Sequence, residues 1–307
     1  MPFTTVHGVR IAYETSGDAA GAPLLLIMGL GMQLTGWPDD LVEGLEELGY
    51  YVIRFDNRDC GLSEKFDHAG TPSVPLALVK TLVRWPLKGA YTFADMAQDA
   101  VGVLDALGIG KAHVVGASMG GMIAQVLAAR HPERVLSLTS IMSSSGRRGL
   151  PGPTRAARAI LFKRPAKPGD FDSLVTHGTR VFQVIGSPVY PTPAPVLRAR
   201  VGAQIKRNVC PGGVLRQMVA IAASGDRSKL LATIGVPTLV IHGAADPLVP
   251  LACGQDTARQ IPGARLEVIE GMGHDLPSQL TERLLSLIDA LTHGKMVADS
   301  TARLDKQ

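Results

Sequence analysis

Short apolar runs alternate with longer amphipathic stretches along most of this chain. Residues 9–17 alternate between apolar and polar side chains, as an antiparallel strand with one exposed face does. Buried strands are expected in the later apolar segments 24–29, 51–57, 112–118, 135–143, 237–243 and 265–271. Because strands that alternate with helical segments form parallel sheets, we expect a mostly parallel sheet with helices on both faces.

A helical pattern precedes the strand at 112–118. Met96, Val103 and Leu107 recur at helical spacing, and Gly108 ends the run. We expect a crossover helix here, which carries the chain to its next strand.

The alternation of strands and helices stops between residues 146 and 230. Nine of the 21 prolines of the chain fall in this segment. We therefore predict a core formed by residues 1–145 and 231–293, an inserted cap at 146–230 and a polar, frayed tail at 294–307. The candidate pocket-lining residues of the cap, which are equally suited to a small core of its own, are Phe171, Phe182, Tyr190, Met218 and Ile221.

The predicted cap is strongly basic. It holds 15 Lys and Arg against three Asp, a net charge of +12, and since the whole chain carries +4, the remainder carries −8. Solvated helix faces explain such a charge most simply. A second hypothesis is that the positive cap steers anionic substrates to the site. The opposite charges would also allow a contact between the cap and body of two subunits in a homodimer.

The remaining composition narrows the class of protein. The chain is 46% hydrophobic, without repeats, a secretory signal or a run of about 18 apolar residues that could span a membrane, so we expect a cytoplasmic globular protein. Cys60, Cys210 and Cys253 form no CxxC pair, which fits free thiols and argues against a zinc site. We expect no nucleic-acid partner.

A strand that runs into a glycine-rich turn and then a helix surrounds Ser118. The sequence GASMG places Gly116 and Gly120 two positions on either side of the serine, where the folded-back chain needs small residues. The start of the following helix adds positive potential and free N–H groups. Although G-x-S-x-G also occurs in ordinary loops, this context predicts that Ser118 is a nucleophile.

A serine nucleophile needs a base that accepts its proton and an acid that orients the base. His274 follows the last predicted strand and is the predicted base, with His242 as an alternative at the same edge of the sheet. Asp246 follows the strand at 237–243, 28 residues before His274, and is the predicted acid.

The rival acids are assigned other roles. Asp275 should point away from the neighbouring His274, while Asp99 and Asp105 should lie on exposed faces of a helix. Asp226 suits a structural salt bridge better than a place in the pocket.

Ester hydrolysis also needs N–H donors that point at the developing oxyanion. The Met119 N–H directly after the nucleophile is one candidate. The Leu30 N–H is the second, in the Gly29-Leu30-Gly31 loop where glycines let the chain approach a substrate, although such glycines also serve simple turns. The predicted chemistry calls for no metal and no organic cofactor.

Five motifs in order, IMGLG, RFDNRDCGLS, GASMGG, HGAADPLVP and GMGHDLP, resemble those of α/β-hydrolase-fold serine esterases over roughly residues 5–292. TGWPDDL and RFDNRDCGLS are similar to the branch of bacterial carboxylesterases and anthracycline methylesterases. The resemblance implies a mostly parallel eight-stranded sheet flanked by helices, an inserted helical cap and a small-molecule ester substrate. Most relatives carry His-Gly before the oxyanion loop, whereas this chain has Met28-Gly29. The usual motif D-x-R-G-x-G-x-S reads D-N-R-D-C-G-L-S here, with Asp59 and Cys60 in place of the usual residues. We expect Cys60 to be a packed thiol.

The same residues leave other activities open. Cofactor-free haloperoxidase or perhydrolase chemistry, C–C bond hydrolysis and thioester hydrolysis can all use a Ser-His-Asp triad. Dehalogenases and epoxide hydrolases of this fold use an aspartate nucleophile, which Ser118 excludes. A non-catalytic ligand receptor on the same fold is the alternative from another class of function.

Overall fold

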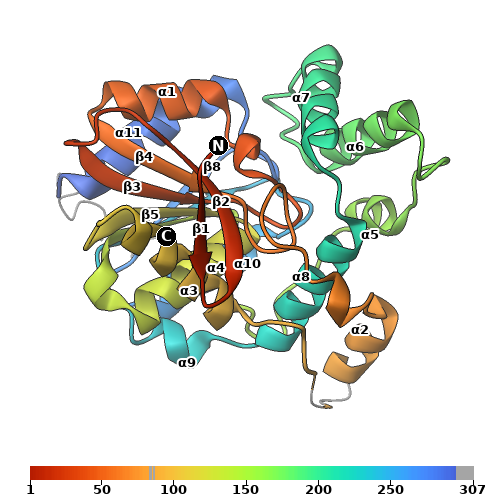
Figure 1. Cartoon of the computed structure of the whole chain (residues 1–307), viewed down its shortest axis with the longest axis horizontal. Helices are drawn as coiled ribbons and strands as arrows, with labels where there is room; N and C mark the ends of the chain where they lie inside the picture. The colour runs from red at the N-terminus through yellow and green to blue at the C-terminus, as the bar shows by residue number, and fades with distance from the viewer. Residues whose placement is uncertain (83–84, 86, 295–307) are drawn as a thin grey trace, which may run out of the picture.

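The computed structural model describes residues 1–82, 85 and 87–294. An eight-stranded sheet forms the centre of the molecule, and helices cover both of its faces (Figure 1). The expected mostly parallel sheet flanked by helices is therefore confirmed. The predicted tail lies outside the described residues from position 295 onwards.

The strand order across the sheet is β1-β2-β4-β3-β5-β6-β7-β8, and only the pairs β1/β2 and β2/β4 are antiparallel. The strands are β1 (Phe3–Val6), β2 (Val9–Ser16), β3 (Ala22–Ile27), β4 (Tyr50–Phe55), β5 (Ala112–Ala117), β6 (Val135–Ile141), β7 (Thr238–Gly243) and β8 (Arg265–Ile269). Each expected strand segment contains a strand. β1 is not predicted, because only Val6 of its four residues is buried and no apolar alternation marks it.

The buried strands are apolar at successive positions because two separate hydrophobic cores lie on opposite faces of the sheet. Along β3, Leu24 and Leu26 face one core, which is shared with α1 (Asp39–Glu47) and α11 (Thr281–Thr292). Leu25 and Ile27 face the other, which is shared with α3 (Phe93–Ala106) and α4 (Met119–Arg130). Successive residues of a strand point to opposite faces, so a strand covered on both sides must be apolar at every position.

The crossover helix is α3, and it begins with a capping box. Thr92 accepts from the Asp95 N–H, and the Asp95 carboxylate accepts from the Thr92 N–H. Asp105 is exposed, as predicted. The prediction that Asp99 is exposed is wrong, because Arg58 reaches it from the loop after β4 and forms two bonds of 2.6 and 2.7 Å with the buried carboxylate.

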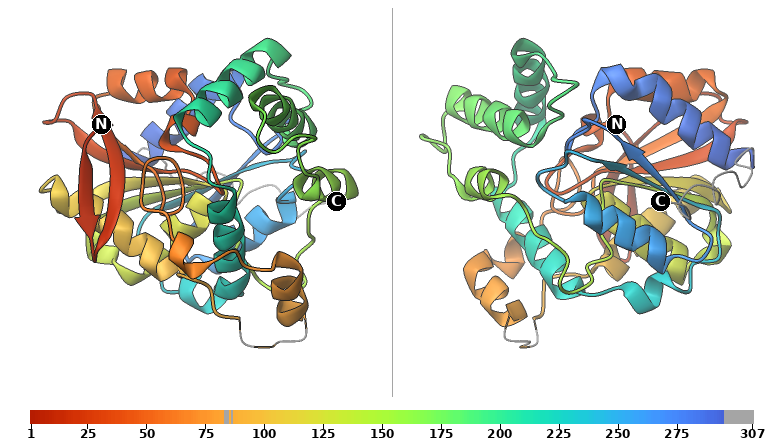
Figure 2. Two further views of the ribbon diagram at one scale, coloured as in Figure 1. Left: turned by 45° about the vertical axis from the view of Figure 1, so that its right-hand side comes forward. Right: turned by 180° about the vertical axis from the view of Figure 1, so that it is seen from behind.

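The segment between β6 and β7 is helical. It contains α5 (Arg155–Phe162), α6 (Phe171–Ile185), α7 (Ala194–Arg207), α8 (Pro211–Ser224) and α9 (Ser228–Leu231). Figure 2 shows α5, α6 and α7 away from the sheet, whereas α8 returns to it and contacts α3. From outside the predicted cap, α2 (Val74–Leu82) packs against α8. The limits of the cap at 146 and 230 stay a prediction.

Some of the candidate lining residues serve packing instead. Tyr190 joins the core beside α1 and α11, and Ile221 joins the core beside α3 and α4. Phe171 lies under the Lys206 ammonium, 5.5 Å from its ring centre, between α6 and α7. None of the described helices is both long and apolar enough to cross a membrane.

Candidate active site

Ser118 lies in the tight turn between β5 and α4. Its φ of 56° and ψ of −119° are uncommon for a residue with a side chain, and such strain costs about 1–3 kcal/mol. Two bonds hold the turn, from the Ser118 N–H to the Ile141 carbonyl at 2.9 Å and from the Ser143 hydroxyl to the Ser118 carbonyl at 2.8 Å. The serine is thus presented, partly exposed, at the carboxyl end of the sheet.

The two predicted glycines of the turn have no space for a side chain. A Cβ on Gly116 would lie 2.3 Å from the Gly120 carbonyl oxygen, and one on Gly120 would lie 2.0 Å from that of Ile27. Backbone atoms cannot move aside as a flexible side chain can. The requirement for glycine therefore follows from the contact of α4 with β5 and β3.

The structure brings the three predicted triad residues together. His274 Nε2 lies 2.9 Å from Ser118 Oγ, and His274 Nδ1 lies 2.7 Å from Asp246 Oδ2. His274 is largely buried, and Asp246 is buried as well. This line of serine, imidazole and carboxylate can move a proton from the hydroxyl to the ring and stabilise the charge that results.

Asp246 is held by its own loop. Its second oxygen, Oδ1, accepts from the N–H groups of Leu248 and Val249, both at 2.8 Å. Because Oδ1 is engaged, Oδ2 is left to face His274.

His242, the alternative base, lies behind this acid. Its Nε2 bonds to the Val249 carbonyl at 2.7 Å and is 3.6 Å from Asp246 Oδ2. The ring is fully buried, and burial lowers its pKa. Both of these contacts lie on the Asp246 loop, whereas His274 is bonded to Ser118, so the geometry favours His274 as the base.

The loop that carries His274 is fixed by the link between α6 and α7. The His274 N–H donates to the Ile185 carbonyl at 2.7 Å. The Ser187 hydroxyl donates to Asp275 Oδ1 at 2.5 Å and accepts from the Gly273 N–H at 2.8 Å. Asp275 therefore bonds to Ser187 of the link and not to the imidazole. This agrees with the prediction that Asp275 points away from His274. No sequence motif marks Ser187, so its contact with this loop was not predicted.

The predicted oxyanion loop follows β3. A Cβ on Gly29 would lie 3.2 Å from Ser118 Cβ, so this loop passes directly beside Ser118. The Met119 N–H is at the start of α4, where backbone N–H groups have no acceptor within the helix. Gly29, from the loop after β3, and Met119, from α4, thus adjoin the serine, and the assignment of the Leu30 and Met119 N–H groups to an oxyanion hole stays a prediction.

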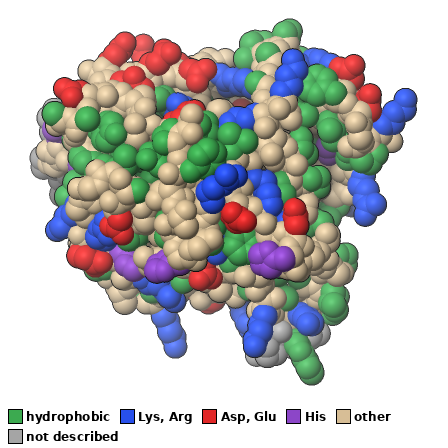
Figure 3. All heavy atoms as spheres, viewed as in Figure 1, with side chains coloured by type: hydrophobic (Ala, Val, Ile, Leu, Met, Phe, Trp, Pro, Cys, Tyr) green, Lys and Arg blue, Asp and Glu red, His purple; other side chains and the backbone are tan. Residues whose placement is uncertain are grey.

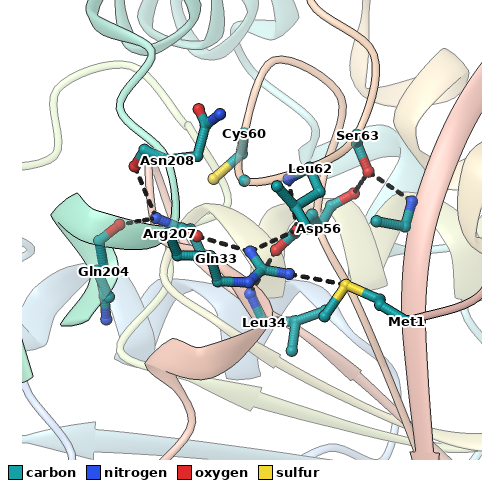
Figure 4. Close-up of polar contacts among 12 residues, drawn as sticks. Met1, Gln33, Leu34, Asp56, Cys60, Leu62, Ser63, Gln204, Arg207 and Asn208 are labelled. Atoms are coloured by element: carbon teal, nitrogen blue, oxygen red, sulfur yellow. Dashed lines mark hydrogen bonds and ion pairs between the residues drawn. The ribbon is translucent and has the colours of Figure 1, made fainter.

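A cluster of hydrogen bonds and one ion pair, which we call the Asp56 cluster, joins the next residues of this loop to the end of α7 (Figure 4). Asp56, which is fully buried, accepts from the Leu34 N–H and from Arg207 Nη1, both at 2.7 Å. Arg207 also donates to Gln33 Oε1 at 2.6 Å, and Gln33 Nε2 donates to the Asn208 carbonyl at 2.9 Å. The Asp56 cluster therefore fixes α7 relative to the loop beside Ser118.

Asp59 and Cys60 lie in the turn after β4. Burial opposes ionisation of Asp59, but bonds from Arg216, the Phe66 N–H and the Tyr91 hydroxyl lower its pKa below the ordinary value. Burial raises the pKa of the Cys60 thiol, so it stays protonated. This agrees with the expectation that Cys60 is a packed thiol.

Several cap arginines are buried against the core. Arg216 forms two bonds to Asp59, at 2.7 and 2.8 Å, and Arg227 is buried with its Nη2 2.6 Å from the Ser144 carbonyl. Burial lowers the pKa of Arg227 to about 10. The simple interpretation of the basic cap as solvated helix faces is therefore wrong for these two residues. Figure 3 shows further Lys and Arg side chains at the outer edge of the molecule, on the side where α5, α6 and α7 lie.

A cavity of about 170 Å³ lies between the oxyanion loop and the cap. Its walls include Gly31, Cys60, Asn208, Cys210 and Val214. A wider hollow of about 630 Å³ is lined by His131, at the opposite end of α4 from Ser118. Among the described residues, no group of three or more His, Cys, Asp or Glu side chains could hold a metal ion.

Comparison with known proteins agrees with this architecture. The family model of the α/β hydrolase fold matches residues 22–278. The chain is 32% identical to rhodomycin D methylesterase DauP of Streptomyces sp. (strain C5), over 95% of this chain and 98% of that protein. It is 31% identical to rhodomycin D methylesterase DnrP of Streptomyces peucetius, over 94% and 97% respectively.

Among solved structures, a meta-cleavage product hydrolase from Pseudomonas fluorescens IP01 superposes with a TM-score of 0.72. It is 22% identical to this chain, and the match covers 96% of this chain and 98% of that one. At this identity the likeness concerns the fold alone.

Proposed function

This chain belongs to the α/β-hydrolase-fold family, and from that membership we propose that it is a serine hydrolase that cleaves carboxylic esters. The observation that carries the proposal is the position of His274, 2.9 Å from Ser118 Oγ and 2.7 Å from Asp246. The resemblance to two methylesterases above 30% identity supports an ester as the substrate.

The reaction begins when Ser118 Oγ attacks the ester carbonyl carbon while His274 Nε2 takes the hydroxyl proton. Asp246 holds the ring by its Nδ1–H and stabilises the imidazolium. The carbonyl oxygen becomes an oxyanion, which the Leu30 and Met119 N–H groups stabilise. One such donor contributes about 2.7–4 kcal/mol in other hydrolases.

The tetrahedral intermediate collapses when the bond to the alcohol oxygen breaks. His274 gives its proton to the departing alcohol, and the acyl group stays on Ser118. A water molecule then attacks the acyl carbon while His274 takes one of its protons. The second collapse returns that proton to Ser118 Oγ and releases the carboxylic acid.

Covalent labelling tests the role of Ser118. A fluorophosphonate probe, which reacts with activated serines, is expected to label the protein at one site per chain, and Ser118→Ala is expected to remove all labelling. Intact mass spectrometry measures the stoichiometry. A wild-type protein that folds but takes up no probe would overturn the proposal and favour the receptor alternative.

A series of p-nitrophenyl esters with increasing acyl length tests the substrate class, with Ser118→Ala as the blank. We expect turnover of at least the short members that depends on Ser118. Matched thioesters and peracid formation, assayed in parallel, distinguish the other reactions that the same triad can perform. A preference for one of those by more than about tenfold in kcat/KM, or about 1.4 kcal/mol, would contradict ester cleavage as the main activity.

A further inference from the structure

The predicted oxyanion donor Leu30 lies within a tight turn of the loop after β3. The Met32 N–H donates to the Gly29 carbonyl at 3.2 Å, and Gly31 has a φ of +65°. These features are typical of a type II turn, with Leu30 and Gly31 as its central residues. The Leu30 N–H belongs to the peptide between Gly29 and Leu30, so its direction depends on how the loop is anchored on either side of that peptide.

Two buried side chains hold the loop on either side of Leu30. Asn57 Nδ2 donates to the Met28 carbonyl at 2.9 Å, before Leu30. Gln217 Oε1 accepts from the Gly31 N–H at 2.8 Å, after Leu30. The two side chains therefore anchor the peptides directly before and directly after the one that contains the Leu30 N–H.

Gln217 is itself fixed in orientation. Its Nε2 donates to the Arg58 carbonyl at 2.9 Å, so its Oε1 must point the other way, towards Gly31. The Arg58 guanidinium is bound in turn to the buried Asp99. Gln217 is fully buried and cannot exchange these partners for water.

Helix α8, which carries Gln217, packs against the loop that contains Leu30. Val214, three residues earlier on the same face of α8, contacts Gly31, where an added Cβ would lie 2.8 Å from Val214 Cγ2. The neighbouring Arg216 binds Asp59 with both arms of its guanidinium. The position of Gln217 relative to the loop is therefore set by packing and by a buried ion pair.

We propose that Gln217 is a positioning residue for the oxyanion hole: from α8, it holds the Gly31 peptide so that the Leu30 N–H stays aimed at the developing oxyanion. The inference rests on the proposed ester hydrolysis. Donors stabilise the transition state only if they are oriented in advance. Loss of the Gln217 acceptor removes the anchor on the Gly31 side of Leu30, and the loop that carries the Leu30 N–H can then shift relative to Ser118.

The test compares Gln217→Met with Gln125→Met. Gln125 is also a fully buried helical glutamine, but its Nε2 donates to Ser140 Oγ, on β6, and not to a residue of the oxyanion loop. For Gln217→Met we expect kcat on a p-nitrophenyl ester to fall about tenfold or more, while KM stays within about twofold. Gln125→Met should keep both parameters within about twofold of wild type.

A trifluoromethyl ketone gives a second readout, because its adduct with Ser118 places an oxyanion in the hole. Its inhibition constant should rise in Gln217→Met by about the factor lost in kcat/KM, which a general loss of packing would not produce. If Gln217→Met does not fold, the comparison is made with Gln217→Asn, whose shorter side chain cannot reach both partners.

The two proposals fail in different ways. If wild type shows no turnover that depends on Ser118, the proposed function is wrong. If wild type is active and a folded Gln217→Met matches Gln125→Met in kcat and in inhibitor affinity, the positioning role of Gln217 is wrong.

Discussion

At the scale of single residues, the site depends on backbone contacts that leave no room for a side chain. Ser118 has a positive φ because α4 starts close against β3 and β5, and that approach depends on Gly116 and Gly120. Any Cβ on Gly120 meets the Ile27 and Met28 backbone. The two glycines of the G-x-S-x-G motif are therefore required by these close backbone contacts.

We predict that Gly120→Ala lowers the free energy of unfolding by about 3 kcal/mol or more, because the added methyl group meets fixed backbone atoms. The matched control is Gly235→Ala, at an exposed position where nothing lies within 4 Å of an added Cβ. Urea denaturation followed by circular dichroism measures both. Equal midpoints for the two variants would contradict the steric explanation.

At the scale of elements, the link between α6 and α7 supports the loop that holds His274, the proposed base. Ile185 and Ser187 bond to Gly273, His274 and Asp275. Burial raises the pKa of Asp275 above its ordinary value of 3.8, although the bonds from Ser187 oppose the shift. The cap segment thus supports the base as well as the oxyanion loop.

Ser187→Ala should lower kcat several-fold and destabilise the protein by about 1–3 kcal/mol, because the buried Gly273 N–H loses its acceptor. The control is Ser224→Ala, which loses only a bond to the Ala220 carbonyl within α8. Steady-state kinetics and thermal unfolding measure the two effects. If both variants retain the kcat of wild type, the link does not support the base.

Asp275→Asn tests the buried charge in the same contact. A raised pKa in the folded state means that the stability contributed by Asp275 is complete below its ordinary pKa and is lost as the pH rises through the folded value. Asparagine does not titrate and keeps an acceptor for Ser187. The stability of Asp275→Asn relative to wild type should therefore increase from about pH 4 to about pH 7. A difference that stays constant across this range, in urea denaturation, would contradict the assignment.

At the scale of the whole molecule, opposite charges join the basic cap to the acidic body within one chain. Arg207 pairs with Asp56, Arg216 with Asp59, and Arg147 with the buried Asp256. Part of the +12 charge expected for the cap is therefore neutralised inside the protein. Steering of anionic substrates, assembly into a homodimer and a cytoplasmic location stay predictions.

Arg216→Met should cost about 3–5 kcal/mol, because it leaves the Asp59 carboxylate buried without its cation. Arg283→Met, which removes a pair with Glu267 whose arginine is 45% exposed, should cost at most about 1 kcal/mol. Chemical denaturation of the two variants measures the difference. Similar losses would show that the Arg216 pair does not stabilise the docked cap.

Much of the fold and the candidate site can be predicted from local sequence. The strands follow from apolar runs, and Ser118, Asp246 and His274 each follow a strand that ends at the same edge of a parallel sheet. Asp99 shows the limit of this reasoning. Helical spacing suggested an exposed side chain, but the position of Arg58 across the fold made it a buried ion pair.

The sequence by itself determined the layers of the sheet, the turn at Ser118 and the order of the three proposed triad residues, because each depends on neighbours within a few positions. Only the tertiary structure decided that Gln217 meets Gly31 and that Ser187 meets Gly273. These partners are 186 and 86 residues apart in the chain. Their pairing depends on how α8 and the α6–α7 link dock on the core, and no local pattern of residues encodes that packing.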